Sequence, residues 1–542
     1  MGGVMSGIGK GITASSIGAV LQSKGFNVTL MKADPYLNVD AGTMNPTEHG
    51  EVFVLHNGLE TDQDMGNYER FLNRQLPPEN YMTNGMVFKY VIDKERALGY
   101  KGKCVEPTYH ITEEILRRIK TAQKKTEADI VVVEIGGTIG EYQNAIFLEA
   151  ARQLKIARPA DVMNIMVSYL PTPAKLGEMK TKPTQNAVRQ LNSYGINPHM
   201  IIARSEIALD KKRKEKIAYM CSLPVEHIIA APDVDSIYDV PINFEKDGLG
   251  NRIVDILELA PRKIKNTLSA WKRFATKRNN PVDRVRIAIP GKYFDSGDFM
   301  LSDAYISIIE ALKASAYHLG IEPEIDWLNV KDFENDTKKL SLLKEYDAVL
   351  IPGGFGATGI EGKINVIEYV RKNKIPYFGI CYGMQLMVVE YARNVAKLQG
   401  AHTTEIDPDT AYPIIDIMEH QKERLRNGEY GGSMRLGTYA ATIQPRTLAH
   451  SLYKSKEIDE RHRHRFEVNP KFTEQLTEKG LVFSGTSPDG LLMEIAELPT
   501  SEHPFFIGTQ FHPEFLSRPL SPHPIFSGFL KAAYTFKKKR SL

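Results

Sequence analysis

The residues best suited to covalent chemistry are one cysteine and a histidine–glutamate pair far downstream. Cys381 lies between Gly379 and Gly383, directly after an apolar run of strand length. Glycines around a nucleophile permit the sharp strand-to-helix turn called a nucleophile elbow. A thiolate also needs a base, and the base needs an orienting carboxylate, which His512 and Glu514 supply. The pattern predicts acyl transfer through a thioester, whereas a lone Cys381 would more often be an inert core residue.

A glycine-rich loop opens the chain at residues 2–11, ahead of a helix-like stretch that begins at Ile12. Backbone N–H groups in such a loop converge on phosphate oxygens, and Lys10 and the helix N-terminus add positive charge. The loop differs from a strict Walker A sequence, because Gly11 stands where Ser or Thr would bind magnesium. Taken alone, the loop is also compatible with a simple tight turn.

Three acidic residues are candidates for holding magnesium beside those phosphates. Asp62 and Asp64 are two residues apart, and Glu134 ends a run of valines. Mg²⁺ is bound by one or two carboxylates together with phosphates, and such ligands collect at the carboxyl ends of parallel strands. A solvated loop is the alternative for the two aspartates. That alternative is poor for Glu134, because a buried carboxylate needs a partner.

Basic segments suggest further anion contacts. Residues 180–185 read Lys-Thr-Lys-Pro-Thr-Gln, and their cations and hydroxyls can hold phosphate oxygens from several sides. Solvated surface is the alternative for this segment, and it is the prediction for the basic tail 537–540. In the run 461–465, Arg-His-Arg-His-Arg, alternate side chains of a strand face opposite sides. We therefore expect one arginine to bind a substrate carboxylate and the others to form ion pairs.

Composition is typical of a globular enzyme. The chain has 542 residues, 42% of them hydrophobic and 25% charged, so two domains are expected. A net charge of +3 gives no reason to expect nucleic acid as a partner. The cysteines lie far apart without metal-ligand spacing, which argues against disulfides and zinc. Without a membrane-length apolar run or a signal-peptide core, we predict no membrane association and a cytoplasmic location.

The fold class expected is α/β, with a division into two domains. Continuous apolar strands such as 27–31, 129–133 and 347–351 alternate with helix-length stretches, which indicates parallel sheets covered on both faces. We predict a synthetase domain over residues 1–262, a basic helical linker over 263–284 and a second α/β domain over 285–542.

The chain resembles CTP synthases, the glutamine-dependent amidoligases, along essentially its whole length. The shared motifs stand in the same order and are 6–11, 32–46, 48–54, 64–71, 134–140, 180–185, 352–356, 379–386, 461–470 and 511–515. The resemblance implies a P-loop-type parallel-sheet synthetase domain plus a class I glutamine amidotransferase domain. It implies phosphorylation of UTP at O4 by ATP, followed by displacement of the phosphate by ammonia that is released from L-glutamine.

The resemblance also assigns roles to residues of the first domain. Mg²⁺ would be held by Asp64 and Glu134. ATP would be bound by Ser6, Gly7, Ile8, Gly9, Lys10, Gly11, Lys32 and Asp64. UTP, or CTP as feedback inhibitor, would be bound by Ser6, Glu141, Tyr142, Gln143, Lys180, Thr181, Lys182, Pro183, Thr184, Gln185 and Lys216.

In the second domain the resemblance makes Cys381 the nucleophile, His512 the base and Glu514 its partner. Gly354 would lie in the loop that shapes the oxyanion hole, and the glutamine substrate would be held by Gly354, Gln385, Glu405 and Arg465. The resemblance further implies activation by GTP, a homotetramer and filaments.

Three features depart from the family pattern. The chain begins at the glycine loop, where the family has a preceding short strand, and we expect a start site placed too late rather than a damaged ATP site. The pyrimidine-contacting stretch 137–144 reads Gly-Thr-Ile-Gly-Glu-Tyr-Gln-Asn, so Glu141 replaces a shorter acid and Gln143 loses a charge. The loop after Gly356 lacks the arginine that commonly precedes Gly359, which bears on GTP activation.

Two alternatives remain open. A cobyrinic-acid-type amidotransferase also joins a P-loop synthetase to a class I glutaminase, although the segments 32–40 and 180–185 argue against it. A catalytically impaired homologue that acts as a filament or scaffold protein is the other alternative.

Overall fold

The computed structural model describes residues 1–173, 175, 177–263, 267–291, 302–354, 359–417 and 434–540. The chain forms two compact units. The first comprises residues 1–44 and 61–275, and the second comprises residues 45–60 and 276–542. The second unit therefore includes a segment from near the start of the chain. The boundaries expected at 262 and 285 stay a prediction.

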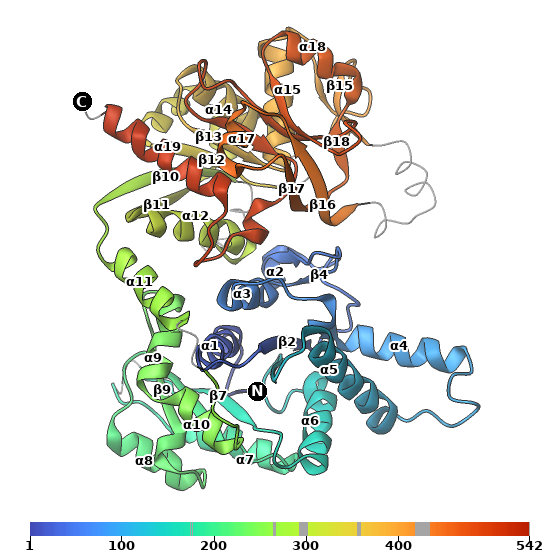
Figure 1. Cartoon of the computed structure of the whole chain (residues 1–542), viewed down its shortest axis with the longest axis vertical. Coiled ribbons are helices and arrows are strands. Elements are labelled where there is room, and N and C mark those ends of the chain that lie inside the picture. The colour runs from blue at the N-terminus through green and yellow to red at the C-terminus, as the bar shows by residue number, and fades with distance from the viewer. Residues whose placement is uncertain are drawn as a thin grey trace. The chain divides into compact units, whose positions relative to one another are not determined.

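The first unit is built on short parallel sheets (Figure 1). One has the order β1-β7-β8-β9, and its strands are Gly2–Gly3, Ile165–Tyr169, Met200–Ser205 and Ile228–Pro232. The other has the order β5-β2-β6, and its strands are Tyr81–Thr83, Val28–Asp34 and Ile130–Ile135. Strands of both sheets pair in parallel, as the continuous apolar runs predict.

Helices cover both faces of these sheets, and the strands alternate between two cores. Met200 and Ile202 of β8 belong to one apolar cluster with Val20, whereas Ile201 belongs to another cluster. This alternation is the period-two pattern of a strand. The helices of the unit are α1 (Lys10–Ser23), α3 (Gln63–Leu72), α4 (Asn84–Arg96), α5 (Thr112–Thr126), α6 (Ala145–Ala157), α7 (Lys182–Ser193), α8 (Lys211–Met220), α9 (Val240–Lys246) and α10 (Leu249–Ile256).

Helix α11 (Thr267–Asn279) occupies most of the predicted linker. Its Trp271 is buried and packs on Phe71 and Tyr238, with ring centroids 5.3 and 5.5 Å away. The segment is therefore helical, as expected, but one face of it is core.

The second unit has one large mixed sheet in the order β11-β10-β12-β13-β21-β20-β19-β16-β17. The first five strands are parallel, and the remaining pairs are antiparallel. Their bounds are β10 Asp283–Gly291, β11 Ile321–Asn329, β12 Ala348–Ile351, β13 Tyr377–Ile380, β16 Arg435–Ile443, β17 Glu457–His464, β19 Val482–Thr486, β20 Met493–Glu497 and β21 Phe506–Thr509. A smaller sheet contains β14 (His402–Thr403), β15 (Pro413–Ile417) and β18 (Phe466–Val468).

Helices cover the parallel part of this sheet on both faces (Figure 1). Val349 and Ile351 of β12 face one core, whereas Ala348 and Leu350 face the other. The first core is covered by α13 (Val330–Asn335), α14 (Ile360–Lys372), α15 (Tyr382–Asn394) and α18 (Thr473–Glu478). The second is covered by α12 (Ile306–Leu319), α17 (Leu448–Tyr453) and α19 (Pro524–Arg540).

The segment 45–60 contains α2 (Pro46–His49) and β3 (Val52–Val54) and leads into β4 (Glu60–Asp62). Within the second unit, Arg461 donates from Nη1 to the carbonyl oxygen of Val54 at 3.0 Å. Phe53 packs edge-on against Phe515, with centroids 5.1 Å apart. The segment is therefore part of the core of the second unit.

The basic tail was predicted to be solvated, and Lys538, Lys539 and Arg540 are exposed in the structure. Helix α19 extends through it, and Lys537 and Lys538 form ion pairs with Asp283 at 2.7 and 2.9 Å. Arg540 pairs with Asp347 at 2.8 Å. A run of cations at a helix C-terminus also complements the helix dipole. The tail therefore anchors α19 to the start of β10 and to β12.

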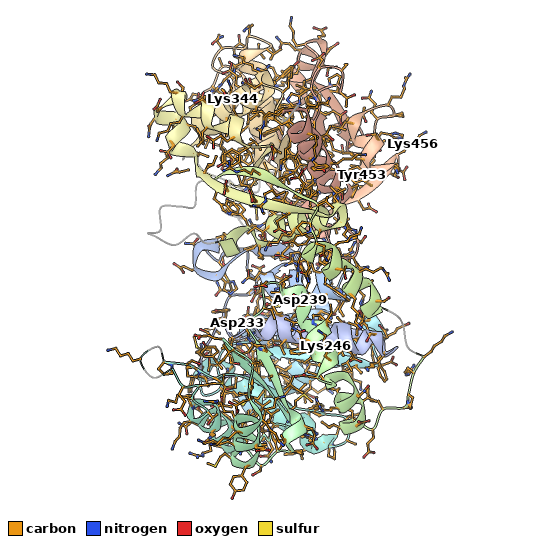
Figure 2. The ribbon with its side chains drawn as sticks, turned by 90° about the vertical axis from the view of Figure 1, so that its left-hand side faces the viewer. Asp233, Asp239, Lys246, Lys344, Tyr453 and Lys456 are labelled. Atoms are coloured by element: carbon orange, nitrogen blue, oxygen red, sulfur yellow. The ribbon has the colours of Figure 1, made fainter. Side chains whose placement is uncertain are left out.

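A buried polar cluster surrounds Glu460 of β17. The hydroxyl of Tyr453 (Figure 2) donates to Oε1 of Glu460 at 2.7 Å, and Nε2 of His523 lies 2.8 Å from the same oxygen. These contacts satisfy one oxygen of a carboxylate that is only 2% exposed. Among the described residues, no helix is both long enough and apolar enough to cross a bilayer.

Candidate active sites

Cys381 occupies the turn between β13 and α15. Its backbone has φ 51° and ψ −100°, and its N–H donates to the carbonyl oxygen of Thr509 at 2.6 Å. A positive φ in a non-glycine residue is a strained conformation, of the kind that concentrates at functional sites. The turn places the sulfur at the carboxyl edge of the sheet and at the N-terminus of α15. The predicted nucleophile elbow is therefore present in the structure.

The glycines on either side of Cys381 permit close backbone packing, as predicted. A Cβ on Gly383 would overlap the carbonyl oxygen of Ile351, and a Cβ on Gly379 would lie 2.7 Å from the carbonyl carbon of Gly383. The hydroxyl of Tyr377 donates to that same carbonyl at 2.9 Å. Larger residues at these positions would separate α15 from β12 and β13 and move the cysteine.

His512 and Glu514 follow β21, the strand beside β13. Nδ1 of His512 lies 2.6 Å from Oε1 of Glu514, and the imidazole stacks on Phe515 with centroids 5.2 Å apart and planes 15° apart. Burial lowers the pKa of His512, but the charges of Glu514 and Cys381 outweigh it and raise the pKa to about 10. The ring is therefore held in one orientation, and its charged form is favoured.

Gly353 lies close to both Cys381 and His512. A Cβ added there would lie 2.9 Å from Cε1 of His512 and 3.6 Å from Cβ of Cys381. The loop that contains Gly353 and Gly354 thus borders both reactive side chains, where an oxyanion hole is needed. The sequence highlighted Gly354 and missed Gly353.

The residues expected to bind glutamine lie around the same cysteine. Gln385 is buried in the first turn of α15, and Glu405 affects the pKa of Tyr382, the residue after Cys381, which burial and this nearby charge raise. Arg465 is half-buried and follows β17, whose Arg463 places its carbonyl oxygen 3.9 Å from the sulfur. Arg463 pairs with Glu60 at 2.8 Å, and the rings of His462 and His464 lie 2.7 and 2.8 Å from Glu494 and Glu467.

Gln510 was missed by the sequence reasoning. Its amide nitrogen lies 3.7 Å from the sulfur of Cys381. A signal existed, because residues two apart on an extended chain share a face and His512 is two residues further along.

The second candidate site lies in the first unit, at the glycine loop. Gly7 and Gly9 have φ of 69° and 77°, which an L side chain rarely adopts. Helix α1 begins at Lys10, two residues before the predicted start. The ammonium of Lys10 donates to the carbonyl oxygen of Gly137 at 2.9 Å, and burial is the main reason that its pKa is lowered. Ser6 is exposed at the tip of the loop, and Ile8 is buried beneath it.

A cluster of carboxylates surrounds Lys32, which is buried. Its ammonium lies 3.1 Å from Glu134 and 3.2 Å from Asp62, and it also pairs with Asp64. Burial alone would lower the pKa of Lys32, but the three carboxylates raise it well above its usual value. Glu134 also accepts from the hydroxyl of Tyr68, so its predicted need for a partner is confirmed.

Asp64 explains the glycine that replaces a Walker Ser or Thr. A Cβ on Gly11 would overlap the Asp64 carboxylate, which therefore occupies the place of that missing side chain. Burial, followed by the charge of Glu134, raises the pKa of Asp64 to about 7. The solvated-loop alternative is wrong for this pair, because Asp62 is buried and caps α3 by accepting from the N–H of Asp64.

The residues expected to contact the pyrimidine nucleotide divide into buried and exposed groups. Thr184 bonds Ser168 at 2.8 Å, and Gln185 donates to Thr181 at 3.1 Å, so these side chains shape the start of α7. The exposed residues of the set are Ser6, Tyr142, Gln143, Lys182 and Lys216. Pro183 stands in the first turn of α7.

Charge and packing connect these residues. Lys180 pairs with Glu178 at 2.6 Å, and this bond, with a smaller effect of Lys216, lowers the pKa of Glu178. Gly140, beside Glu141, has no room for a Cβ because Gln190 of α7 fills that space. Glu141 is also close enough to Lys10 to affect its pKa. The structure thus brings the loop 137–144, the glycine loop and α7 together.

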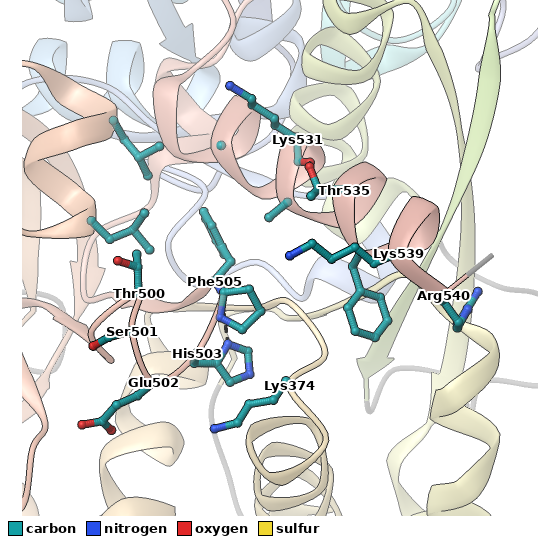
Figure 3. A pocket seen from close by; sticks show the side chains of 16 residues that line it. Lys374, Thr500, Ser501, Glu502, His503, Phe505, Lys531, Thr535, Lys539 and Arg540 are labelled. Carbon is teal, nitrogen blue, oxygen red and sulfur yellow. Dashed lines mark hydrogen bonds between the residues drawn. The ribbon is translucent and has the colours of Figure 1, made fainter. Parts of the chain in front are cut away.

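A hollow of about 730 Å³ lies elsewhere in the second unit, beside α19 (Figure 3). Lys374 and Phe505 line it, and they precede β13 and β21, whereas Cys381 and His512 follow those strands. The hollow is therefore at the opposite edge of the sheet from the nucleophile. The departure noted after Gly356 lies outside the described residues.

Two family profiles match this chain. CTP synthase N-terminus matches residues 1–259, and Glutamine amidotransferase class-I matches residues 300–532. CTP synthases of Caldanaerobacter subterraneus and Methanothermobacter thermautotrophicus are 47% and 48% identical to it, over 99% and 98% of this chain and 98% and 97% of theirs. The CTP synthase of Pyrococcus furiosus is 47% identical over 100% of this chain and 98% of its own.

A solved structure is also similar in part. The glutaminase domain of a Trypanosoma brucei CTPS with bound acivicin is 33% identical, and the match covers 46% of this chain and 94% of that one with a TM-score of 0.43.

Proposed function

Since the chain belongs to the CTP synthase family, whose reaction converts UTP to CTP with ATP and glutamine, we propose how its two candidate sites share that reaction. The observation that carries the proposal is the buried cluster of Cys381, His512 and Glu514 in one unit, together with a lysine- and carboxylate-lined glycine loop in the other.

Glutamine is hydrolysed in the second unit. The sulfur of Cys381 attacks the carboxamide carbon, and the oxyanion forms beside backbone N–H groups near Gly354 and Tyr382. His512 keeps a proton on Nδ1, which faces Glu514. Its Nε2 accepts the proton of the Cys381 thiol and then gives that proton to the departing ammonia. Water then hydrolyses the thioester and releases glutamate. Gln385, Glu405 and Arg465 hold the substrate.

UTP is activated in the first unit. Lys10 and Lys32 face the ATP phosphates, and the loop from Ser6 to Gly11 wraps them with backbone N–H groups. The γ-phosphoryl group passes to O4 of UTP, which turns a poor leaving group into phosphate. Ammonia then adds at C4 and displaces that phosphate to give CTP.

Mg²⁺ fits the carboxylates of this site. Asp64 fills the space left by Gly11, where the side chain of a strict Walker loop would bind the ion, and Glu134 pairs with the same lysine, Lys32, as Asp64 does. These two carboxylates would hold the ion, which supplies charge neutralisation of the phosphates. Lys32 balances the same carboxylates in the structure, so the cluster is arranged around a cation.

The nucleotide base and its phosphates are recognised by the exposed residues around α7. Lys182 and Lys216 offer ammonium groups that are exposed, and Glu141 and Gln143 offer acceptors near the base. We extend the proposal to the other family properties: CTP as feedback inhibitor at this site, GTP as activator, a homotetramer capable of forming filaments, and a cytoplasmic location. The family match removes the reason for the cobyrinic-acid-type alternative, and nothing observed favours the impaired scaffold.

Substitution of the nucleophile tests the proposal. Cys381→Ala should abolish CTP formation from glutamine and leave CTP formation from ammonium salts, both measured with UTP, ATP and Mg²⁺. Cys104→Ser, at an exposed cysteine, is the matched control and should leave both reactions intact. Equal loss of both reactions in Cys381→Ala would refute separate sites, and a parent chain inactive with either donor would refute the function.

A further inference from the structure

Gln510 connects the catalytic strand to the nucleophile. It follows β21 directly, its side chain is fully buried, and its N–H donates to the carbonyl oxygen of Glu494 at 2.9 Å. Its Nε2 lies 3.7 Å from Sγ of Cys381, and its Oε1 accepts from Nε2 of Gln385 at 3.2 Å. A buried amide with both ends used is a fixed donor.

The neighbouring bonds fix which end of the Gln510 amide faces the sulfur. Nε2 of Gln385 also donates to the carbonyl oxygen of Phe466 at 2.8 Å, and a carbonyl can only accept. Gln385 therefore presents its NH₂ group toward Gln510, and Gln510 must accept this hydrogen bond with its Oε1. The NH₂ group of Gln510 is then directed at Cys381.

We propose that Gln510 is a positioning residue that donates a hydrogen bond to the thiolate of Cys381 and holds it for attack. The proposal rests on Cys381 as the nucleophile proposed above. A hydrogen bond from a fixed donor stabilises a charged acceptor more than its neutral form, and a buried site strengthens the effect. Gln510 thus acts together with His512 on one sulfur, from the same stretch of chain.

Charged groups from several elements lie near Cys381 or near Tyr382, the residue that follows it. His512 and Glu514 follow β21, and Glu405 follows β14. Lys363 of α14 lies over the Tyr382 ring, 5.3 Å from its centroid. Arg463 of β17 offers its carbonyl oxygen. Unlike these groups, Gln510 carries no charge, so its loss removes a donor and changes no net charge.

The test compares three variants in a Cys104→Ser background, which removes the exposed thiol. Gln510→Met keeps the volume and removes the donor, and Gln510→Glu keeps the shape and places an acceptor at the sulfur. Gln475→Met makes the same chemical change at an exposed position of α18 and is the matched control. The probe is iodoacetamide, and the rate of alkylation of Cys381 is followed by mass spectrometry between pH 5 and pH 10.

The midpoint of the alkylation profile should move to higher pH by about one unit in Gln510→Met, and further in Gln510→Glu, because a hydrogen bond to a charged group contributes roughly a factor of ten or more. Glutaminase kcat should fall about tenfold with a smaller change in KM, while ammonia-dependent CTP formation stays at the parent rate. The control should match the parent throughout.

A profile of Gln510→Met that superposes on the parent would overturn the proposal. If ammonia-dependent synthesis is also lost, the methionine variant has disturbed folding, and Gln510→Glu then decides: an unshifted profile in that variant overturns the proposal. Alkylation reads the thiol alone, so a parent chain that makes no CTP yet shows the shift would refute the proposed function and leave this inference standing.

Discussion

Adding one methyl group at Gly353 should impair glutamine hydrolysis and leave CTP formation from ammonia unchanged. The new Cβ would lie 2.9 Å from Cε1 of His512, whereas ordinary Cβ contacts begin at 3.4 Å. The imidazole must therefore retreat by about 0.5 Å, and a misplacement of about 1 Å at a reacting group costs on the order of 10²-fold in rate. Retreat is hindered because the ring is stacked on Phe515, which packs against Phe53.

We therefore expect glutaminase kcat/KM of Gly353→Ala to fall by about 10- to 100-fold. The assay is glutamate release from glutamine, and ammonia-dependent CTP formation serves as the internal control and should be unchanged. Gly400→Ala is the matched control, because Gly400 has φ 77° and open space around it. That variant carries backbone strain in the same unit and should keep its glutaminase. Glutaminase of Gly353→Ala within twofold of the parent would refute the packing argument.

Three more perturbations have defined outcomes. Gly11→Ala pushes a methyl group onto Asp64 and should reduce CTP formation about 100-fold with either nitrogen donor; normal activity would mean that Asp64 is not needed where it lies. Lys182→Ala removes an exposed ammonium and should raise KM for UTP severalfold while KM for glutamine stays within twofold, and the reverse pattern would contradict the assignment. Burial lowers the pKa of His503 to about 4 from 6.5, so the folded state favours the neutral ring and loses stability as pH falls from 6.5 toward 4. The apparent melting temperature of the parent should drop more steeply over that window than that of His503→Asn, and parallel curves would show that His503 does not titrate this way.

The strands and the elbow could be predicted from the sequence because local pattern determines them. Apolar runs covered on both faces indicate parallel strands, and the glycines beside Cys381 indicate a sharp turn. The start of α1 at Lys10 was placed two residues late, since helix boundaries are weakly encoded. The ion pairs of the exposed basic tail were not predicted, because Asp283 and Asp347 lie far from it in the chain.

The parts of the two sites that were not predicted depend on contacts between segments that lie far apart in the sequence. The departure at Gly11 was visible in the sequence, but its reason, the carboxylate of Asp64, became apparent only when α1 and α3 were packed together. Gln510 and Gly353 carry no charge or nucleophile that would mark them as functional, and they matter through where their atoms lie. In the same way, nothing in composition distinguishes residues 45–60 from their neighbours, although they join the compact unit of the glutaminase.

That segment has a consequence for how the protein is made on the ribosome. The hydrogen bond between Val54 and Arg461 joins residues 407 positions apart. At synthesis rates of about 5–20 residues per second, Arg461 emerges roughly 20–80 s after Val54. Strand β3, whose three residues are almost fully buried in the finished fold, can pair with β4 early but must wait that long for Arg461. Phe53 likewise waits for Phe515, so the stack of Phe53, Phe515 and His512 at the nucleophile can form only after nearly the whole chain has been made.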